Sequence, residues 1–167
     1  MNVIRRSSFK RPLVEGIKVM YPFKQVMSMD AKPKILCIDD DVNTLDALER
    51  DLRSAFTVSK TSDVSDIPKL LTKDTALVIC DYNLGDINGL QVFEKIRDLY
   101  PSCMRILLTG EVGLDDIADA IRSHLIHKFI LKPWDGPMLK LLMLEAVGIH
   151  RLLHERDKFK ELSLTDP

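Results

Sequence analysis

From residue 34 onward, short apolar runs alternate with longer stretches in which apolar residues recur every three or four positions. A short apolar run fits a strand buried on both faces, whereas the longer spacing fits an amphipathic helix. Five such repeats predict a parallel sheet with helices packed on both faces. The predicted strands are Lys34–Ile38, Phe56–Lys60, Ala76–Cys80, Met104–Leu108 and Lys128–Leu131.

Helical spacing marks the segments that follow the predicted strands. The fifth helix is expected to begin near Asp135 and to run past the end of the domain. The other four are indicated by apolar residues three or four positions apart: Leu45, Leu48 and Leu52; Ile67, Leu70 and Leu71; Leu90, Phe93 and Ile96; Ile117, Ala120 and Ile121.

The composition fits a soluble globular domain. Apolar residues make up 46% of the chain and charged residues 29%, with a net charge of −1. No apolar run approaches the roughly 20 residues that a membrane helix needs, and the N-terminus lacks the apolar core of a secretory signal. Cys37, Cys80 and Cys103 are interpreted as buried thiols in a reducing compartment. We therefore expect a cytoplasmic protein that binds neither membranes nor nucleic acid directly.

Candidate ligand-binding residues follow the first, third, fourth and fifth predicted strands. In a doubly wound sheet, ligands bind outside the carboxyl ends of the strands, so these residues are candidates for one shared site. They are Asp39, Asp40 and Asp41 after the first strand, Asp81 after the third, Thr109 after the fourth and Lys132 after the fifth.

This set of side chains has the chemistry of phosphoryl transfer. Crowded carboxylates repel one another unless a cation neutralises them, and Mg²⁺ prefers oxygen ligands. A carboxylate beside Mg²⁺ can attack phosphorus and form an acyl phosphate. A lysine then neutralises the transferred group, and a hydroxyl can hydrogen-bond to one of its oxygens. The sequence therefore predicts a Mg²⁺-dependent phosphorylation site.

Four separated blocks resemble the signature motifs of response-regulator receiver domains of two-component signalling. They are ILCIDDD, VICDYNLGDINGL, LLTG and KP, and the resemblance covers roughly residues 33–150. It implies a flavodoxin-like α/β fold, with a doubly wound five-stranded parallel sheet in the order 2-1-3-4-5 and an extended C-terminal helix. It also implies a phosphoprotein that catalyses only its own phosphoryl transfer and dephosphorylation.

The resemblance assigns roles to the acidic residues. Asp81 corresponds to the phosphoacceptor, and Asp39 and Asp40 to the acidic pair that holds Mg²⁺, with Asp40 as the direct ligand. Together with Asp81, the backbone carbonyl of Asn83 completes the expected metal site. The expected partner is a sensor histidine kinase or a phosphotransfer protein.

The resemblance also implies a switch. Thr109 and Lys132 would contact the phosphoryl group, and Thr109 would move together with Phe129 to change the face formed by the fourth helix, fifth strand and fifth helix. The Lys132-Pro133 bond is expected to be cis. One departure is Gly85, where the family usually has proline, so we expect a looser turn there.

Three alternatives remain open at this stage. A haloacid-dehalogenase-type phosphatase would explain Asp39-x-Asp41, but Asn43 stands where that family expects threonine. A docking pseudo-receiver would lack the acceptor aspartate or the lysine, and neither is missing. Taken alone, the acidic run could simply cap a helix.

His150 and His154, one helical turn apart, form a weak metal-site candidate without an apparent third ligand.

The two ends of the chain carry separate expectations. Residues 1–32 form a basic extension with a net charge of +5, expected to be flexible or to dock on an acidic partner. Residues 151–167 are expected to form a linker helix that leads to a missing output domain. The ending Leu164-Thr165-Asp166-Pro167 resembles the lead-in of GGDEF diguanylate cyclase domains, which implies cyclic-di-GMP signalling.

The last helix is also a candidate for self-association. Its apolar residues follow a spacing of three and four, and a second apolar seam continues beyond the first. We expect a weak homodimer, formed through this helix or through the switching face. The two seams are Leu139, Leu142, Ala146, Ile149 and Leu153, then Leu152, Phe159 and Leu162.

Overall fold

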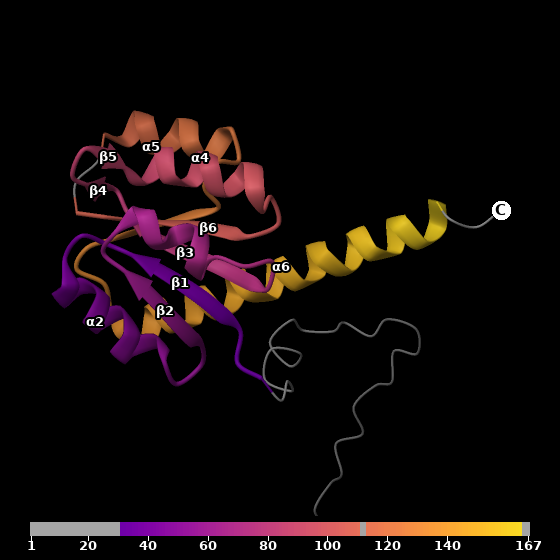
Figure 1. The fold of residues 1–167 in the computed structure, drawn as a ribbon, viewed down its shortest axis with the longest axis horizontal. Helices are drawn as coiled ribbons and strands as arrows, with labels where there is room; N and C mark the ends of the chain where they lie inside the picture. Colours follow the sequence, from indigo (N-terminus) through magenta and orange to yellow (C-terminus); the bar gives the residue numbers. More distant parts are fainter. Residues whose placement is uncertain (1–30, 111–112, 165–167) are drawn as a thin grey trace, which may run out of the picture.

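A five-stranded parallel sheet forms the centre of the computed structural model, which describes residues 31–110 and 113–164. The strand order is β2-β1-β3-β6-β7 (Figure 1). This is the predicted 2-1-3-4-5 order of a doubly wound sheet, so the expected fold class is confirmed. The strands are β1 (Lys34–Ile38), β2 (Thr57–Thr61), β3 (Thr75–Asp81), β6 (Met104–Thr109) and β7 (Lys128–Leu131).

Helices cover both faces of the sheet (Figure 1). Helices α2 and α6 pack on one face, and α3, α4 and α5 on the other, each over its own cluster of buried apolar side chains. The helical segments are α2 (Val42–Leu52), the short 3-10 helix η1 (Val64–Asp66), α3 (Ile67–Leu70), α4 (Gly89–Leu99), α5 (Leu114–Arg122) and α6 (Gly136–Leu164).

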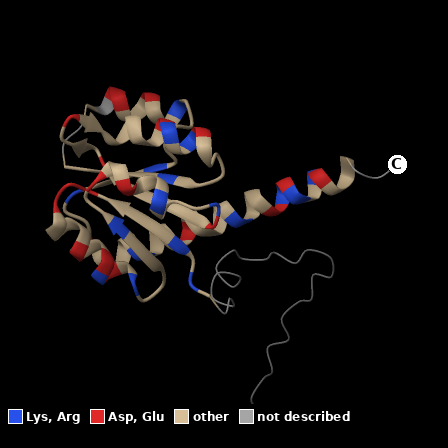
Figure 2. Cartoon of the chain, viewed as in Figure 1, with Lys and Arg blue, Asp and Glu red and all other residues tan. Residues whose placement is uncertain are grey.

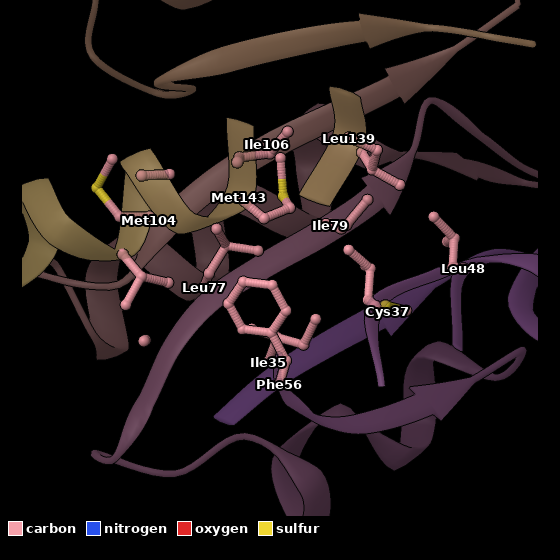
Figure 3. Packing of buried hydrophobic residues seen from close by; sticks show 14 of the residues in the cluster. Ile35, Cys37, Leu48, Phe56, Leu77, Ile79, Met104, Ile106, Leu139 and Met143 are labelled. Atoms are coloured by element: carbon pink, nitrogen blue, oxygen red, sulfur yellow. The ribbon is translucent and has the colours of Figure 1, made fainter. Parts of the chain in front are cut away.

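The core beneath α2 and α6 shows why the apolar spacing produces these contacts. In Figure 3, Leu139 and Met143 of α6 lie over the strand residues Ile79 and Ile106. These side chains are at most 1% exposed. Residues four apart on a helix share a face, so one turn of α6 places both side chains on the sheet. This packing fixes the first part of α6 against the domain.

Two strands extend one residue beyond their apolar runs and thereby include site residues. Asp81 is the last residue of β3 and pairs with Leu108, and Thr109 is the last residue of β6 and pairs with Leu131. The apolar pattern predicts both residues just after their strands. The ladder continues because backbone pairing needs no apolar side chain, and it holds both residues on regular backbone.

The turn after Asp81 is tighter than expected. Strands β4 (Asn83–Leu84) and β5 (Ile87–Asn88) pair as an antiparallel hairpin. Gly85 lies in its turn with φ +82°, a left-handed conformation that glycine adopts without strain. The expectation of a looser turn at Gly85 is therefore wrong, since a glycine serves a tight hairpin turn better than a proline would.

Helix α6 continues well past the sheet. Figure 1 shows its second half projecting from the domain, and Figure 2 shows that this half carries both acidic and basic residues. Neither α6 nor any other helix in the described ranges combines the length and apolar character that crossing a membrane requires. The predictions for residues 1–30 and for Thr165-Asp166-Pro167 fall outside the described residues.

Candidate functional site

Three carboxylates meet at the edge of the sheet where β1 and β3 end. Asp39, Asp40 and Asp81 each offer an oxygen, and these oxygens all lie within 4.8 Å of one another. Asp39 and Asp81 are buried, whereas Asp40 is exposed. The structure thus brings together three of the four acidic residues that the sequence pattern placed at this edge.

Lys132 enters the cluster from the end of β7. Its Nζ lies 2.9 Å from Asp39 Oδ2 and 3.1 Å from Asp81 Oδ1. Burial raises the pKa of Asp39, although hydrogen bonds from the Asp41 amide and from Lys132 oppose this effect. Burial lowers the pKa of Lys132, but its bonds to Asp39 and Asp81 outweigh burial, so the pKa of Lys132 is raised overall. The ammonium therefore remains charged and holds the two buried carboxylates together.

Asp41 takes a different part from its two neighbours. It is the N-cap of α2, and its carboxylate accepts hydrogen bonds from the Asn43 amide at 3.0 Å and the Thr44 hydroxyl at 2.9 Å. The Thr44 hydroxyl and the Asn43 amide hold the pKa of Asp41 below its usual range. The helix-cap interpretation of the acidic run therefore applies to Asp41, while its amide orients Asp39 through a bond of 2.9 Å.

Thr109 completes the edge from β6. Its side chain is fully buried, and its hydroxyl has no hydrogen-bond partner within the described part of the chain. A buried hydroxyl without a partner costs free energy, so this position favours a state in which an acceptor arrives. The orphaned hydroxyl fits a site that receives an oxygen-rich group.

Asn83 and Phe129 both lie at the surface. Asn83 is exposed at the start of β4, two positions beyond Asp81. Phe129 lies on the edge strand β7 and is 38% exposed. The apolar spacing alone left core packing open for Phe129. Side chains alternate between the two faces of a strand, and on β7 Ile130 is buried on one face whereas Phe129 and Leu131 are exposed on the other.

The donor set fits a hard divalent cation. Three carboxylates carry a charge of −3, and Lys132 reduces the sum to −2. Oxygen donors and a residual charge of this size suit Mg²⁺, which commonly uses one or two carboxylates together with a phosphate. Asp39, Asp40 and Asp81 are the residues that would hold it.

Sequence reasoning missed two contacts near this site. Trp134 donates its indole N–H to Asp51, which lies 83 positions earlier in the chain, and no sequence signal connects the two residues. Gly89 lies so close to Asp81 that a Cβ atom there would be 2.4 Å from the Asp81 carbonyl oxygen. The sequence does contain a signal for the contact between Gly89 and Asp81. A glycine at the start of a helix beside the predicted site suggests that another part of the backbone approaches closely.

Residues 35–143 match the family model of the response regulator receiver domain. The chain belongs to this family. The matched range lies within the predicted domain bounds of 33–150. A receiver domain is a signalling module rather than a true enzyme, and it implies a cognate histidine kinase as partner. The acidic triad is typical of a phosphoacceptor site and consistent with the Mg²⁺ site of receiver domains.

Curated relatives agree with this assignment. The chain is 30% identical over 130 residues to the hydrogenase transcriptional regulatory protein HoxA of Bradyrhizobium diazoefficiens, covering 77% of this chain and 27% of that protein. It is 26% identical over 125 residues to a chemotaxis protein CheY homolog of Campylobacter jejuni, covering 69% of this chain and 92% of that protein. The chain therefore spans only about a quarter of the length of the HoxA regulator, 27%.

Solved structures agree as well. The signal receiver domain of an HD domain-containing protein from Pseudomonas fluorescens Pf-5 is 31% identical, with a TM-score of 0.70 over 77% of this chain and 96% of that one. A CheY-like receiver domain from Methanospirillum hungatei shares the fold at 22% identity, with a TM-score of 0.65 over 72% of this chain and 98% of that one. Membership of the receiver family leaves no support for the haloacid-dehalogenase alternative.

Proposed function

We propose that Asp81 accepts a phosphoryl group from a sensor histidine kinase or a phosphotransfer protein, and that this modification switches the domain. The observation that carries the proposal is the position of Asp81, whose carboxylate lies 3.1 Å from the Lys132 ammonium inside a cluster of three carboxylates. A pseudo-receiver that only docks a partner has no need for this buried arrangement.

Each residue has a distinct part in the proposed transfer. As an oxygen of Asp81 bonds to phosphorus, the bond between phosphorus and the donor breaks, and the donor leaves with that electron pair. Lys132 neutralises one phosphoryl oxygen, and the Thr109 hydroxyl donates a hydrogen bond to another. Mg²⁺ held by Asp39, Asp40, Asp81 and the Asn83 carbonyl would neutralise further charge on the phosphoryl group.

The proposed switch links Thr109 to the face formed by α5, β7 and α6. A hydrogen bond to the phosphoryl group would draw Thr109 toward Asp81, and Phe129 would turn inward from its exposed position. Phosphorylation shifts this equilibrium because Thr109 gains a partner only in the phosphorylated state. Ile121, Phe129 and Leu131 supply exposed apolar surface on α5 and β7, with 39%, 38% and 57% exposure.

The output is proposed to pass through α6 to a further domain. Thr165-Asp166-Pro167 supports a GGDEF effector and cyclic-di-GMP signalling on sequence resemblance alone. The names of the relatives indicate other outputs, transcriptional regulation for HoxA and chemotaxis for the CheY homolog. Reading the gene beyond Pro167 decides between them: a GGDEF motif would support the cyclase output, and a DNA-binding domain would overturn it.

Acetyl phosphate with Mg²⁺ tests the phosphorylation itself. Intact-mass analysis should show one phosphoryl adduct on the protein. The adduct should not form when EDTA is present from the start of the reaction, and it should be absent in Asp81→Asn. Asp41→Asn is the matched control, because Asp41 belongs to the same acidic run but caps α2, so this variant should keep the adduct. No adduct on the unmodified protein, or an adduct that survives in Asp81→Asn, would refute the proposal.

A further inference from the structure

The only tryptophan of the chain connects the lysine end of the site to α2. Trp134 lies two positions after Lys132, and its indole N–H donates a 2.9 Å hydrogen bond to Asp51 Oδ2. The Asp51 side chain is only 19% exposed, so this bond is largely shielded from water. A hydrogen bond to a carboxylate in such a place is stronger than a bond between two neutral groups.

The same carboxylate lies against the start of α6. Gly136 is the first residue of that helix, and a Cβ atom there would be 3.0 Å from both Cγ and Oδ2 of Asp51. A carboxylate beside a helix N-terminus is favoured, because the unpaired N–H groups of the first turn carry partial positive charge. Asp51 therefore contacts the connection from Lys132 to α6 at two points, Trp134 and Gly136.

The other end of this connection is held by the sheet. The amide of Lys132 donates a hydrogen bond of 2.8 Å to the carbonyl oxygen of Thr109. Lys132 is held by Thr109 and Trp134 is held by Asp51, and only residue 133 lies between them. The backbone that carries the Lys132 side chain therefore has little freedom. A fixed backbone restricts the positions that Nζ of the long lysine side chain can reach, and Nζ must lie between Asp39 and Asp81.

We propose that Asp51 is a positioning residue for Lys132. By holding Trp134 and the first turn of α6, it keeps residues 132–136 in the arrangement that places the Lys132 ammonium against Asp39 and Asp81. The inference rests on the proposed phosphorylation of Asp81, because it assigns Asp51 a part in that transfer. Helix α2 would then contact the site at both ends, with Asp41 as its N-cap and Asp51 in its last turn.

Two variants remove the contact from opposite sides. Asp51→Leu removes the acceptor at similar size, and Trp134→Phe removes the donor while keeping an aromatic ring. We expect each to lower the rate of phosphorylation by acetyl phosphate about tenfold, because displacing a charged group from its productive position weakens transition-state stabilisation. The double variant should be no slower than either single variant, since both break one interaction. Asp51→Asn keeps an oxygen that accepts the indole N–H and should restore the rate to within about twofold.

Ser54→Ala provides the matched control. Lys140 Nζ of α6 lies 3.3 Å from Ser54 Oγ in the turn that follows α2, so this contact joins the same two regions without touching the lysine connection. Loss of this contact should leave the phosphorylation rate unchanged. Urea denaturation of each variant verifies that the domain is folded under the assay conditions.

A second readout follows Lys132 without any phosphoryl transfer. Acylation by an amine-reactive ester, mapped by mass spectrometry, should label Lys132 several-fold faster in Asp51→Leu and Trp134→Phe than in the unmodified protein. Labelling of exposed Lys158 should stay constant in all of them. Unchanged Lys132 labelling and an unchanged phosphorylation rate in both variants would overturn the inference. If the unmodified protein takes no phosphoryl group, the proposed function fails instead, and the labelling still decides whether Asp51 positions Lys132.

Discussion

The amide of Lys132 donates a hydrogen bond of 2.8 Å to the carbonyl oxygen of Thr109, which is the last paired residue of β6, while Lys132 directly follows Leu131, the last paired residue of β7. This bond extends the ladder between the two strands to the edge where the site lies. It ties the backbone of the lysine to that of the buried threonine. A movement of Thr109 toward a phosphoryl group would therefore pull on β7, the strand that carries Phe129.

Replacing Thr109 by valine should stabilise the unphosphorylated protein. The hydroxyl is buried without a partner in the described ranges, so its removal at similar size should raise the free energy of unfolding by about 1 kcal/mol. Urea denaturation measures this change. The variant should still take the phosphoryl group but lose the chemical-shift change of Phe129 upon beryllofluoride addition. A less stable Thr109→Val protein would show that the hydroxyl already has a partner.

Gly89→Ala should damage both the fold and the site. The added Cβ would lie 2.4 Å from the Asp81 carbonyl oxygen and 3.2 Å from Leu107 Cδ1, so the backbone that carries the acceptor must shift. Overpacking of this kind costs about 1–3 kcal/mol. Gly110→Ala is the control, because a Cβ at that position meets no atom within 4 Å. The midpoint temperature of thermal unfolding and the rate of phosphorylation should both be lower in Gly89→Ala. Both should remain near the original values in Gly110→Ala.

Arg105 is buried and contacts the half-buried His127. The Arg105 guanidinium donates to backbone carbonyl oxygens, among them that of Leu125 at 2.7 Å and that of Cys103 at 2.8 Å. Its backbone N–H donates to His127 Nδ1 at 2.9 Å. Burial, followed by the charge of Arg105, lowers the pKa of His127 from 6.5 to about 4, with smaller effects from His124 and His150. The imidazole is therefore neutral in the folded protein near neutral pH.

This lowered pKa predicts acid sensitivity. Between pH 6.5 and about 4, the unfolded chain binds a proton at His127 that the folded state excludes. The stabilising contribution of His127 is thus complete above pH 6.5 and is lost as the pH falls toward 4. Urea titrations at intervals across this window should show stability decreasing with acidity. His127→Asn keeps an acceptor for the Arg105 amide and should make the free energy of unfolding less dependent on pH. If the dependence stays equally steep in this variant, groups other than His127 cause it.

The projecting half of α6 should mediate weak self-association that phosphorylation strengthens. Leu152, Phe159 and Leu162 are 46%, 72% and 69% exposed, and pairing with a second α6 would cover them. Light scattering across a concentration series should show more dimer with beryllofluoride than without it.

A matched pair of variants locates this contact. Leu162→Glu should reduce the dimer fraction by placing charge in the apolar seam. Leu99→Glu alters an equally exposed leucine, 67% against 69%, on a helix of the opposite face of the sheet, and should have no effect. A strictly monomeric protein in both states would refute the dimer and leave the receiver assignment intact.

Local and periodic properties of the structure followed from the sequence by itself. Strands β1 and β7 have the predicted bounds, because a short apolar run is the main sequence signal of a buried strand. The bounds predicted for β2, Phe56–Lys60, are wrong by one residue, since this strand is Thr57–Thr61. Alternating strands and helices imposed a parallel sheet, and parallel strands bring their carboxyl ends to one edge. For this reason the sequence alone predicts one shared site for Asp39, Asp81, Thr109 and Lys132.

Only the tertiary structure decided how those side chains use the edge. Asp40 faces the cluster whereas its neighbour Asp41 caps α2, a choice made by the direction in which the helix leaves the strand. Lys132 pairs with Asp39 across 93 positions of the chain, and Trp134 meets Asp51 across 83. Such partners have no common period or local motif. Their contact depends on the packing of α2 and α6 over the sheet, which results from the summed burial of many side chains and not from any one segment.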